Sequence, residues 1–277
     1  RQRDFQGRLV FQHRYGRKWH LLLPNARVPG FLDEAECLRH LDELRQRWDG
    51  RLSHFFPNGQ NHLSKGVCVG NGRPVSIAAF LMSCTDRDAV RQRTLASLAR
   101  SDWGDRPVQV IMDQAQFHTR RERLTHTAWR AFQRALQTEA DYMLYLEDDV
   151  GFNRHFRHNL DSWVWLQQRR VHCATLCNFS LPELAWDLEG HAMFVPAKSM
   201  VGSQALLLSR EFVRDCLKHW AEGPVDIDVK IGYLASRWQE ALPAHAPSLV
   251  QHQDVRSTLG HGRCKSPFFD RHWRAAS

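Results

Sequence analysis

An alternation of apolar, strand-length runs with helical patterns constrains the fold of this chain more than any other feature. Continuous apolar runs of the length of a buried strand cover residues 75–83, 107–112 and 141–146. The segments between them, 85–99 and 121–140, carry apolar side chains at the three- and four-residue spacing of a helix. Strands that alternate with helices form parallel sheets, because a parallel pair needs a crossover connection. The sequence therefore predicts a three-layer α/β/α domain with a mainly parallel central sheet.

The N-terminal part of the chain lacks this alternation and predicts a small separate extension. Two short strands are expected around Gly16, followed by a helix over residues 33–48 whose apolar side chains recur at helical spacing. We therefore divide the chain into an N-terminal extension, residues 1–72, and a main domain, residues 73–277.

The chain carries a positive net charge of +8, from 38 Lys and Arg against 30 Asp and Glu. Its densest basic clusters lie in predicted helices, where a charge run usually forms a solvated face. No zinc-finger or RNA-binding signature accompanies them. We therefore expect an anionic small ligand or acceptor and no nucleic acid. A nucleic-acid binder is the alternative, and a steep salt dependence of binding would support it.

The cysteines and the apolar stretches bear on the compartment. Among the seven cysteines, the closest pair, Cys173 and Cys177, lacks the second pair that a zinc site needs, so buried free thiols are expected. Free thiols are typical of a reducing compartment. No apolar stretch approaches the ~20 residues of a membrane span. We expect a cytoplasmic protein, with the Golgi lumen as the alternative if an N-terminal anchor has been removed; peripheral membrane association is compatible with either.

Three consecutive carboxylates, Glu147, Asp148 and Asp149, directly follow the third predicted strand. Adjacent anions at the end of a buried strand repel one another and lose hydration, so a cation must offset their charge. A divalent metal is the simplest candidate, and hard oxygen ligands suit Mn²⁺ or Mg²⁺. The alternative from the residues alone is a surface turn in which Asp149 or Asn153 caps the next helix.

Three later segments follow the acidic motif in an order that resembles a known family. Residues 202–211 read as a strand followed by a helix, residues 224–228 read Pro-Val-Asp-Ile-Asp, and residues 247–252 read Pro-Ser-Leu-Val-Gln-His before Ser-Thr-Leu-Gly at 257–260. This order is similar to that of the GT-A glycosyltransferases, in which an Asp-x-Asp or Glu-Asp-Asp motif after a strand holds Mn²⁺ against the diphosphate of a nucleotide sugar. The last segment also resembles, weakly, N-acetylglucosaminyltransferase IV-like enzymes, from which Gln253-Asp254 departs.

The resemblance implies a metal and donor site at the acidic motif. It assigns Asp149 to the metal, together with Asp148 or Glu147, and in such motifs the residue at Glu147 more often faces the ribose or the backbone. His252 is the implied late histidine ligand, with a packed or capping histidine as the alternative. The cation would neutralise the charge that develops as the sugar–phosphate bond breaks.

The nucleotide of the donor is expected at the ends of the first two strands. Thr85, Asp86 and Arg87 follow the first strand. There Asp86 would accept a hydrogen bond from the uracil or ribose, and Arg87 would bind a phosphate. Asp113 ends the second strand and is a further candidate for the nucleoside. The alternative is that Thr85 or Asp86 only caps the following helix.

Inverting transfer needs a base that removes the proton of the acceptor hydroxyl. Asp226 and Asp228 are the candidates, because they lie ahead of a helix predicted over residues 229–238, and we favour Asp226. The two residues share a face in an extended segment but diverge at a helix start. Helix capping and a favourable interaction with the helix dipole are the alternative roles, and a retaining enzyme would need no such base.

The sequence as a whole predicts a metal-dependent glycosyltransferase that moves a sugar from a nucleotide donor, by default UDP, to a hydroxyl. The acceptor is a glycan, glycolipid, protein or small molecule, and a loop over residues 180–199 with Trp186 is expected beside it. Two rival classes remain. One is a phosphodiesterase- or nuclease-type hydrolase that uses the acidic motif, and the other is a non-catalytic binding protein with a transferase-like fold.

Overall fold

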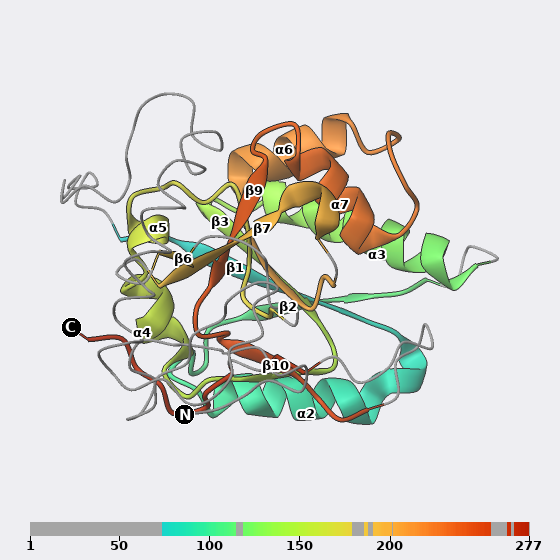
Figure 1. Ribbon diagram of the computed structural model, residues 1–277. Coiled ribbons are helices and arrows are strands. Elements are labelled where there is room, and N and C mark those ends of the chain that lie inside the picture. The colour runs from blue at the N-terminus through green and yellow to red at the C-terminus, as the bar shows by residue number, and fades with distance from the viewer. Residues whose placement is uncertain are drawn as a thin grey trace, which may run out of the picture.

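The computed structural model describes most of the predicted main domain (Figure 1). The described residues are 74–114, 119–178, 186–187, 191–200, 202–255, 265–266 and 269–276. The predicted extension, residues 1–72, and the Ser-Thr-Leu-Gly segment at 257–260 lie outside them, so the expectations for these parts stay predictions.

The first elements follow the predicted order of strands and helices. They are β1 (Ile77–Ser83), the 3-10 turn η1 (Thr85–Arg87), α2 (Asp88–Ala99), β2 (Val108–Met112), α3 (Arg120–Leu136) and β3 (Tyr142–Glu147). β1 lies between β2 and β3, and both pairs are parallel. Met82 of β1 lies opposite Glu147 of β3, so these two strands end side by side.

Five further strands complete an eight-stranded sheet in the order β2-β1-β3-β8-β5-β9-β7-β6. They are β5 (Cys173–Thr175), β6 (Trp186–Asp187), β7 (Ala192–Pro196), β8 (Ala205–Ser209) and β9 (Ala241–His245). Within this sheet, β7 and β8 run against the direction of the other strands. The prediction of an α/β fold with a mainly parallel sheet is therefore confirmed.

The prediction of a loop over residues 180–199 is wrong for the part that the structure describes. β7 pairs with β9 along its full length, and the 3-10 turn η2 (Ala197–Ser199) follows it. Trp186 pairs through its backbone with Met193. Met193 and Phe194 are buried, so the apolar side chains that suggested an acceptor loop are part of a buried strand instead.

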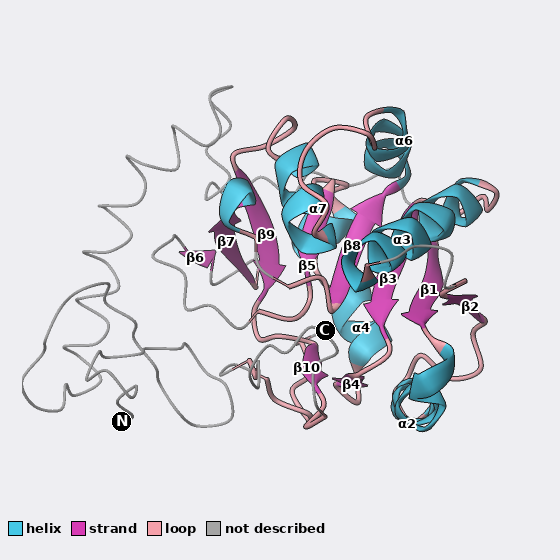
Figure 2. Ribbon diagram, turned by 90° about the vertical axis from the view of Figure 1, so that its right-hand side faces the viewer, coloured by secondary structure: helices cyan, strands magenta, loops and turns pink. Residues whose placement is uncertain are grey.

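Helices cover both faces of the sheet, as a three-layer domain requires (Figure 2). One face carries α3 together with α6 (Arg210–Lys218) and α7 (Ile227–Ala235), which contact one another. The opposite face carries α2, α4 (Phe156–Asp161) and α5 (Val164–Gln167). Each helical layer encloses its own apolar cluster against the sheet.

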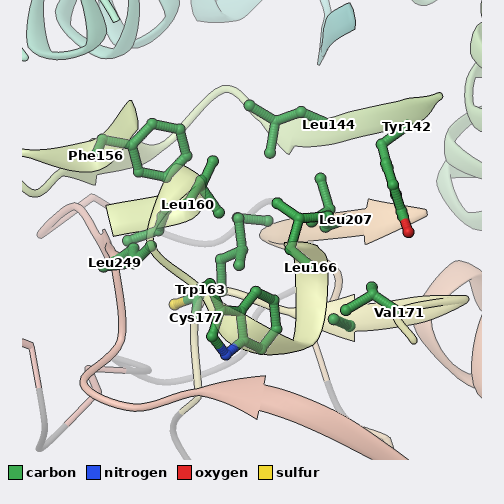
Figure 3. Packing of buried hydrophobic residues seen from close by; sticks show 14 of the residues in the cluster. Tyr142, Leu144, Phe156, Leu160, Trp163, Leu166, Val171, Cys177, Leu207 and Leu249 are labelled. Atoms are coloured by element: carbon green, nitrogen blue, oxygen red, sulfur yellow. The ribbon is translucent and has the colours of Figure 1, made fainter. Parts of the chain in front are cut away.

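Side chains of β3 belong to both apolar clusters, because successive side chains of a strand point to opposite faces of the sheet. Leu144 lies in the cluster under α4 and α5, with Phe156, Trp163 and Leu207 (Figure 3). Tyr145, the next residue, lies in the opposite cluster with the side chains of α3, α6 and α7. A strand buried on both faces is held rigidly, and its end is a firm support for the acidic motif that follows.

A second, two-stranded sheet joins β4 (Val150–Phe152) to β10 (Val250–His252). The pair is antiparallel, and His252 lies opposite Val150, the residue directly after the acidic motif. Gln253 extends the pairing, since its backbone N donates to the carbonyl of Asp149 at 2.7 Å. This ribbon brings a late histidine to the motif from a distant part of the sequence.

Within the described residues, Cys173 and Cys216 are buried free thiols, as predicted, whereas the free thiol of Cys84 is only half-buried. Burial raises the pKa of the Cys173 thiol, which keeps it protonated and unreactive. In the same part of the chain, no helix is both long enough and apolar enough to cross a membrane.

Candidate functional site

The acidic motif is buried at the carboxyl end of β3 and in the turn to β4. Asp148 and Asp149 are only 5% and 6% exposed. The N-cap of the next helix, α4, is His155, and Asn153 Oδ1 accepts a hydrogen bond from His155 N at 2.7 Å just ahead of the helix. The alternative of a surface turn is wrong, because Asp148, Asp149 and Asn153 are all buried. Carboxylates as buried as these require compensating partners.

Arg87 bridges the two aspartates from η1. Its Nε donates to Asp148 Oδ1 at 2.7 Å, and its Nη2 donates to Asp149 Oδ2 at 2.6 Å. Ser83, the last residue of β1, donates from Oγ to Asp148 Oδ2 at 2.6 Å. The planar fork of a guanidinium can hold two carboxylates at once, which a lysine cannot do in the same way. The cation that the sequence argument assigned to a metal is thus supplied, at these two oxygens, by Arg87.

The surroundings move the pKa values of the two aspartates in opposite directions. Burial raises the pKa of Asp148 above its usual value, and the hydrogen bonds from Ser83 and Arg87 only partly offset this effect. Burial acts in the same direction on Asp149, but His252 and Arg87 outweigh it and lower the pKa. Asp149 is therefore the aspartate that the site keeps ionised most firmly.

His252 approaches Asp149 from β10, with Nε2 3.3 Å from Oδ2. The contact with Asp149 raises the pKa of His252 against the opposing effect of burial. The other oxygen of this carboxylate, Asp149 Oδ1, is buried and has no hydrogen-bond partner among the described residues. Because an unpaired buried carboxylate oxygen is costly, this atom marks the place where a ligand would be favourable.

Glu147 faces a second group of polar residues. Its Oε1 accepts a hydrogen bond from Ser203 Oγ at 2.5 Å. Burial, together with the charges of Asp149, Asp228 and Asp148, raises the pKa of Glu147 from 4.5 to about 7, against the effect of Ser203. Gly202, the neighbour of Ser203, donates from its backbone N to Asp228 Oδ2, so adjacent residues of one segment contact Glu147 and Asp228.

The two candidate bases diverge at the start of α7. Asp226 is the N-cap, in an extended conformation and without a side-chain cap, and it pairs with Arg121 of α3 at 3.0 Å. α7 begins at Ile227, two residues before the predicted start, so Asp228 lies in its first turn. Asp228 Oδ2 accepts a hydrogen bond from Gly202 N at 2.8 Å, on the same side as Ser203. The structure thus groups Asp228, rather than Asp226, with the motif; the role of either as a base stays a prediction.

Of the residues predicted to hold the nucleotide, Arg87 is the one with a described contact to the acidic motif. Thr85 and Asp86 are exposed on η1 and form no side-chain cap, so the capping alternative is wrong for both. Asp113 follows β2, where its backbone N donates to Ser83 O at 2.7 Å and its carboxylate lies 3.4 Å from Arg123. Their part in nucleotide binding stays a prediction.

The residues that contact the motif without having been predicted include Ser83, Thr94, Ser203 and Gln253. Gln253 Nε2 donates to Val150 O and to Thr94 Oγ1, both at 2.8 Å, so the residue that departs from the family pattern anchors the backbone after the motif. The parallel register would have revealed Ser83, because it follows the residue opposite Glu147. Ser203 carries no sequence signal, since only the antiparallel pairing of β8 with β3 brings it there.

The donor atoms at the site suit a hard divalent cation in their chemistry. Asp149 offers a buried oxygen without a described partner, and His252 offers an imidazole nitrogen beside it. With the side chains as they lie, the described part of the chain contains no group of three His, Cys, Asp or Glu that could hold a metal ion. Arg87 occupies carboxylate oxygens of both aspartates, so a metal that used these oxygens would compete with its guanidinium.

No known protein family matches the sequence, and no curated protein matches it. Solved structures that are similar include A197 from STIV, at 13% identity and a TM-score of 0.44 over 73% of this chain and 99% of that chain. Another is S. aureus TarS, at 12% identity and a TM-score of 0.44 over 66% of this chain and 37% of that chain. Likenesses this remote leave the function to be argued from the residues of the site.

Proposed function

We propose that this protein is a metal-dependent glycosyltransferase that moves a sugar from a nucleotide donor, by default UDP, to a hydroxyl acceptor with inversion. The observation that carries the proposal is the buried Asp149 carboxylate, with one unpaired oxygen and His252 beside it. This carboxylate lies beyond the carboxyl ends of β1 and β3, where open α/β sheets bind their ligands. The order of motifs that resembles the GT-A enzymes supports the same chemistry.

Asp149 and His252 would hold the metal, Mn²⁺ or Mg²⁺, with Glu147 or Asp148 as the further carboxylate. The bound cation would offset the negative charge of a diphosphate leaving group. Ser83 orients Asp148 by a hydrogen bond at 2.6 Å, so this residue of β1 is a positioning residue for the motif.

The nucleoside would lie along the ends of β1 and β2, over Thr85, Asp86 and Asp113. The exposed side chains of Thr85 and Asp86 on η1 are available for hydrogen bonds to a base or a ribose. Asp113 adjoins Ser83 through its backbone, which places the end of β2 beside the motif.

Asp228 is the stronger candidate for the base that activates the acceptor hydroxyl. Its carboxylate accepts from Gly202 N, next to the Ser203 that bonds Glu147, whereas the carboxylate of Asp226 is engaged with Arg121. Backbone N–H groups of Gly202 and Val229 each donate to one of its oxygens at 2.8 Å, which orients the carboxylate. Each oxygen keeps a lone pair, so an oriented carboxylate of this kind can still accept a proton.

Calorimetric titration of UDP and of GDP, with Mn²⁺ and then with EDTA, tests the donor site. Wild type is expected to bind one nucleotide only when Mn²⁺ is present, because a metal held by Asp149 and His252 would supply the positive charge that a diphosphate needs. Asp149→Ala is expected to lose this binding, since it removes the oxygen that anchors the metal. A screen of the sugar conjugates of that nucleotide, with hydroxyl acceptors, then identifies the reaction.

Asp161→Ala is the matched control for this titration. Asp161 is a carboxylate of α4 that pairs with Arg157 and belongs to none of the groups at the site. Its variant should bind the nucleotide as wild type does. If neither nucleotide binds with or without metal, the sugar-nucleotide proposal is lost.

One observation favours a metal-dependent phosphodiesterase as a second candidate. His252 of β10 contacts Asp149, and Asp228 of α7 is held by Gly202, the neighbour of the Ser203 that bonds Glu147. Metal-assisted hydrolysis uses carboxylates and histidines gathered from several elements. Release of nitrophenol from bis(p-nitrophenyl) phosphate with Mn²⁺, without any affinity for UDP or GDP, would establish this reaction instead of sugar transfer.

A further inference from the structure

Arg87 forms a buried ion pair with the two aspartates that are candidates to bind a metal. Its side chain is 11% exposed, and those of Asp148 and Asp149 are 7% and 8% exposed. Charges this deep are only weakly screened by water and salt. A second cation that approaches the same carboxylates therefore meets the full repulsion of the guanidinium.

We infer that Arg87 is an internal counter-ion that competes with the divalent cation for Asp148 and Asp149, and that cation binding releases its guanidinium to an incoming phosphate. This inference rests on the proposed metal site. It adds a residue that sets the affinity of that site for the metal and couples metal binding to anion binding.

One carboxylate oxygen, Asp149 Oδ1, can bind an entering cation without displacing Arg87 first. Asp149 Oδ1 is buried and has no partner within the described chain, while Arg87 and His252 both face Oδ2. A divalent cation bound first at Oδ1 would place a second positive charge beside the carboxylate that already pairs with Arg87. The two cations repel each other, and the guanidinium is displaced because its single charge attracts the carboxylate less than the divalent ion does.

The backbone around Arg87 allows the side chain to leave. Arg87 ends η1, a three-residue 3-10 turn, and is the N-cap residue of α2, where its side chain makes no capping hydrogen bond. A swing of its side chain therefore leaves the start of α2 and the pairing of β1 intact. The freed guanidinium would stay at the strand ends, where the diphosphate of the donor is proposed to lie, and guanidinium binds phosphate oxygens in a bidentate manner.

Two consequences follow from competition at a shared pair of carboxylates. Removal of Arg87 should strengthen metal binding, because the competing cation is gone. Metal and phosphate should also strengthen each other's binding in wild type, and this coupling is reciprocal by thermodynamic necessity. A residue that only orients the carboxylates for the metal would give the opposite result for metal affinity.

The test is a titration of the full chain with Mn²⁺. Binding is monitored by calorimetry and by the electron paramagnetic resonance signal of free Mn²⁺. Arg87→Gln is expected to bind Mn²⁺ at least about tenfold more tightly than wild type, because the buried carboxylates lose their other cation. Arg87→Lys keeps the positive charge but loses the planar guanidinium, so an intermediate affinity for Mn²⁺ is expected. If Arg87→Gln does not fold without metal, the affinity of Arg87→Lys for Mn²⁺ still tests the inference.

Arg157→Gln is the matched control for the loss of a mostly buried arginine from an ion pair with an aspartate. The Arg157 side chain is 14% exposed and pairs with Asp161 of the same helix, away from the carboxylates of the motif. This variant should bind Mn²⁺ as wild type does. Melting temperatures add an independent readout: Arg87→Gln should melt below wild type in EDTA, and Mn²⁺ should raise its melting temperature more than that of wild type.

A second titration uses pyrophosphate as the probe for the released guanidinium. Wild type should bind pyrophosphate in the presence of Mn²⁺ about tenfold more tightly than Arg87→Gln does, since it alone can add the bidentate contact. Unchanged or weaker Mn²⁺ binding by both Arg87 variants overturns the inference. If Arg87→Gln binds Mn²⁺ more tightly and no variant binds UDP or GDP, the inference stands and the transferase proposal falls.

Discussion

Glu147, Asp148 and Asp149 are adjacent in the sequence but meet different partners, and their pKa values respond differently. Burial and the anionic neighbours of Glu147 raise its pKa to about 7. Burial also raises the pKa of Asp148, whereas His252 and Arg87 lower that of Asp149. Their surroundings thus give three carboxyl groups different acidities. Asp226 and Asp228 also meet different partners, because one precedes α7 and the other lies in its first turn.

The separation of this pair leads to a prediction at the residue scale. Asp228→Asn should lower the rate of sugar transfer about 10²- to 10⁴-fold, because an amide cannot remove the acceptor proton. Its affinity for the nucleotide with Mn²⁺ should stay the same, since Asp228 is not among the residues proposed to hold the metal or the nucleotide. Asp226→Asn loses only a partly exposed ion pair and should transfer sugar normally. Rates measured for both variants with a saturating donor check the assignment, which is reversed if Asp226→Asn is the inactive one.

At the scale of elements, the position of α7 decides where Asp228 lies. Gly232, one turn further along this helix, faces η2 at very close range. A Cβ at this position would lie 2.5 Å from the Ala197 carbonyl oxygen and 3.0 Å from Met200 Cβ. The helix can approach η2 this closely because Gly232 has no side chain. Asp228 is on the same side, where Gly202 N holds its carboxylate.

The close approach predicts that Gly232→Ala destabilises the fold, although alanine is the better helix former. Displacement of the helix from η2 should cost about 1–3 kcal/mol, more than the ~1 kcal/mol gained in helix propensity. Urea unfolding at neutral pH measures the difference. Gly151→Ala in β4 is the control, because its Cβ would meet atoms no closer than 3.7 Å and should be tolerated. Greater stability of Gly232→Ala would show that α7 is free to shift.

At the scale of the whole molecule, His245 joins three parts of the fold. It lies on β9, is 1% exposed, and packs against Trp163 ahead of α5 and against Trp273 of the C-terminal segment. Its Nδ1 lies 2.7 Å from the Pro247 carbonyl oxygen, while Nε2 is buried without a described hydrogen-bond partner. Burial lowers the pKa of His245 from 6.5 to about 3.

The low pKa of His245 predicts that the whole domain loses stability in acid. The folded state binds fewer protons than the unfolded state between pH 6.5 and about 3, so stability is full above pH 6.5 and falls as the pH decreases. The loss should reach about 3 kcal/mol near pH 4. His245→Gln does not titrate, so its stability should decline less over this range in urea unfolding measured at several pH values. The exposed His272→Gln should follow wild type, and parallel curves for all three proteins would contradict the prediction.

Much of the fold and the outline of the site could be predicted from local pattern. The apolar run of β3 and the carboxylates behind it indicated a buried strand with an acidic end, and parallel order placed the ends of β1 and β3 together. The prediction of a loop over 180–199 was wrong because the aromatic residues Trp186 and Phe194 were interpreted as a binding surface. The pairing of β6 and β7 with each other, and of β7 with β9, is not visible in the local sequence. His252 was predicted only through a resemblance, since no local pattern relates it to the motif.

The sequence by itself determined the α/β class, the parallel order of the first three strands and the place of the acidic motif, because these depend on the spacing of neighbouring residues. Only the tertiary structure decided which partners the carboxylates have. Arg87 and Ser203 reach the motif from a turn and from a segment beside an antiparallel strand, and Gly202 of that segment holds Asp228 at a helix start. Burial then makes their charges and hydrogen bonds strong, and burial is a property of the packed molecule that no stretch of sequence possesses alone.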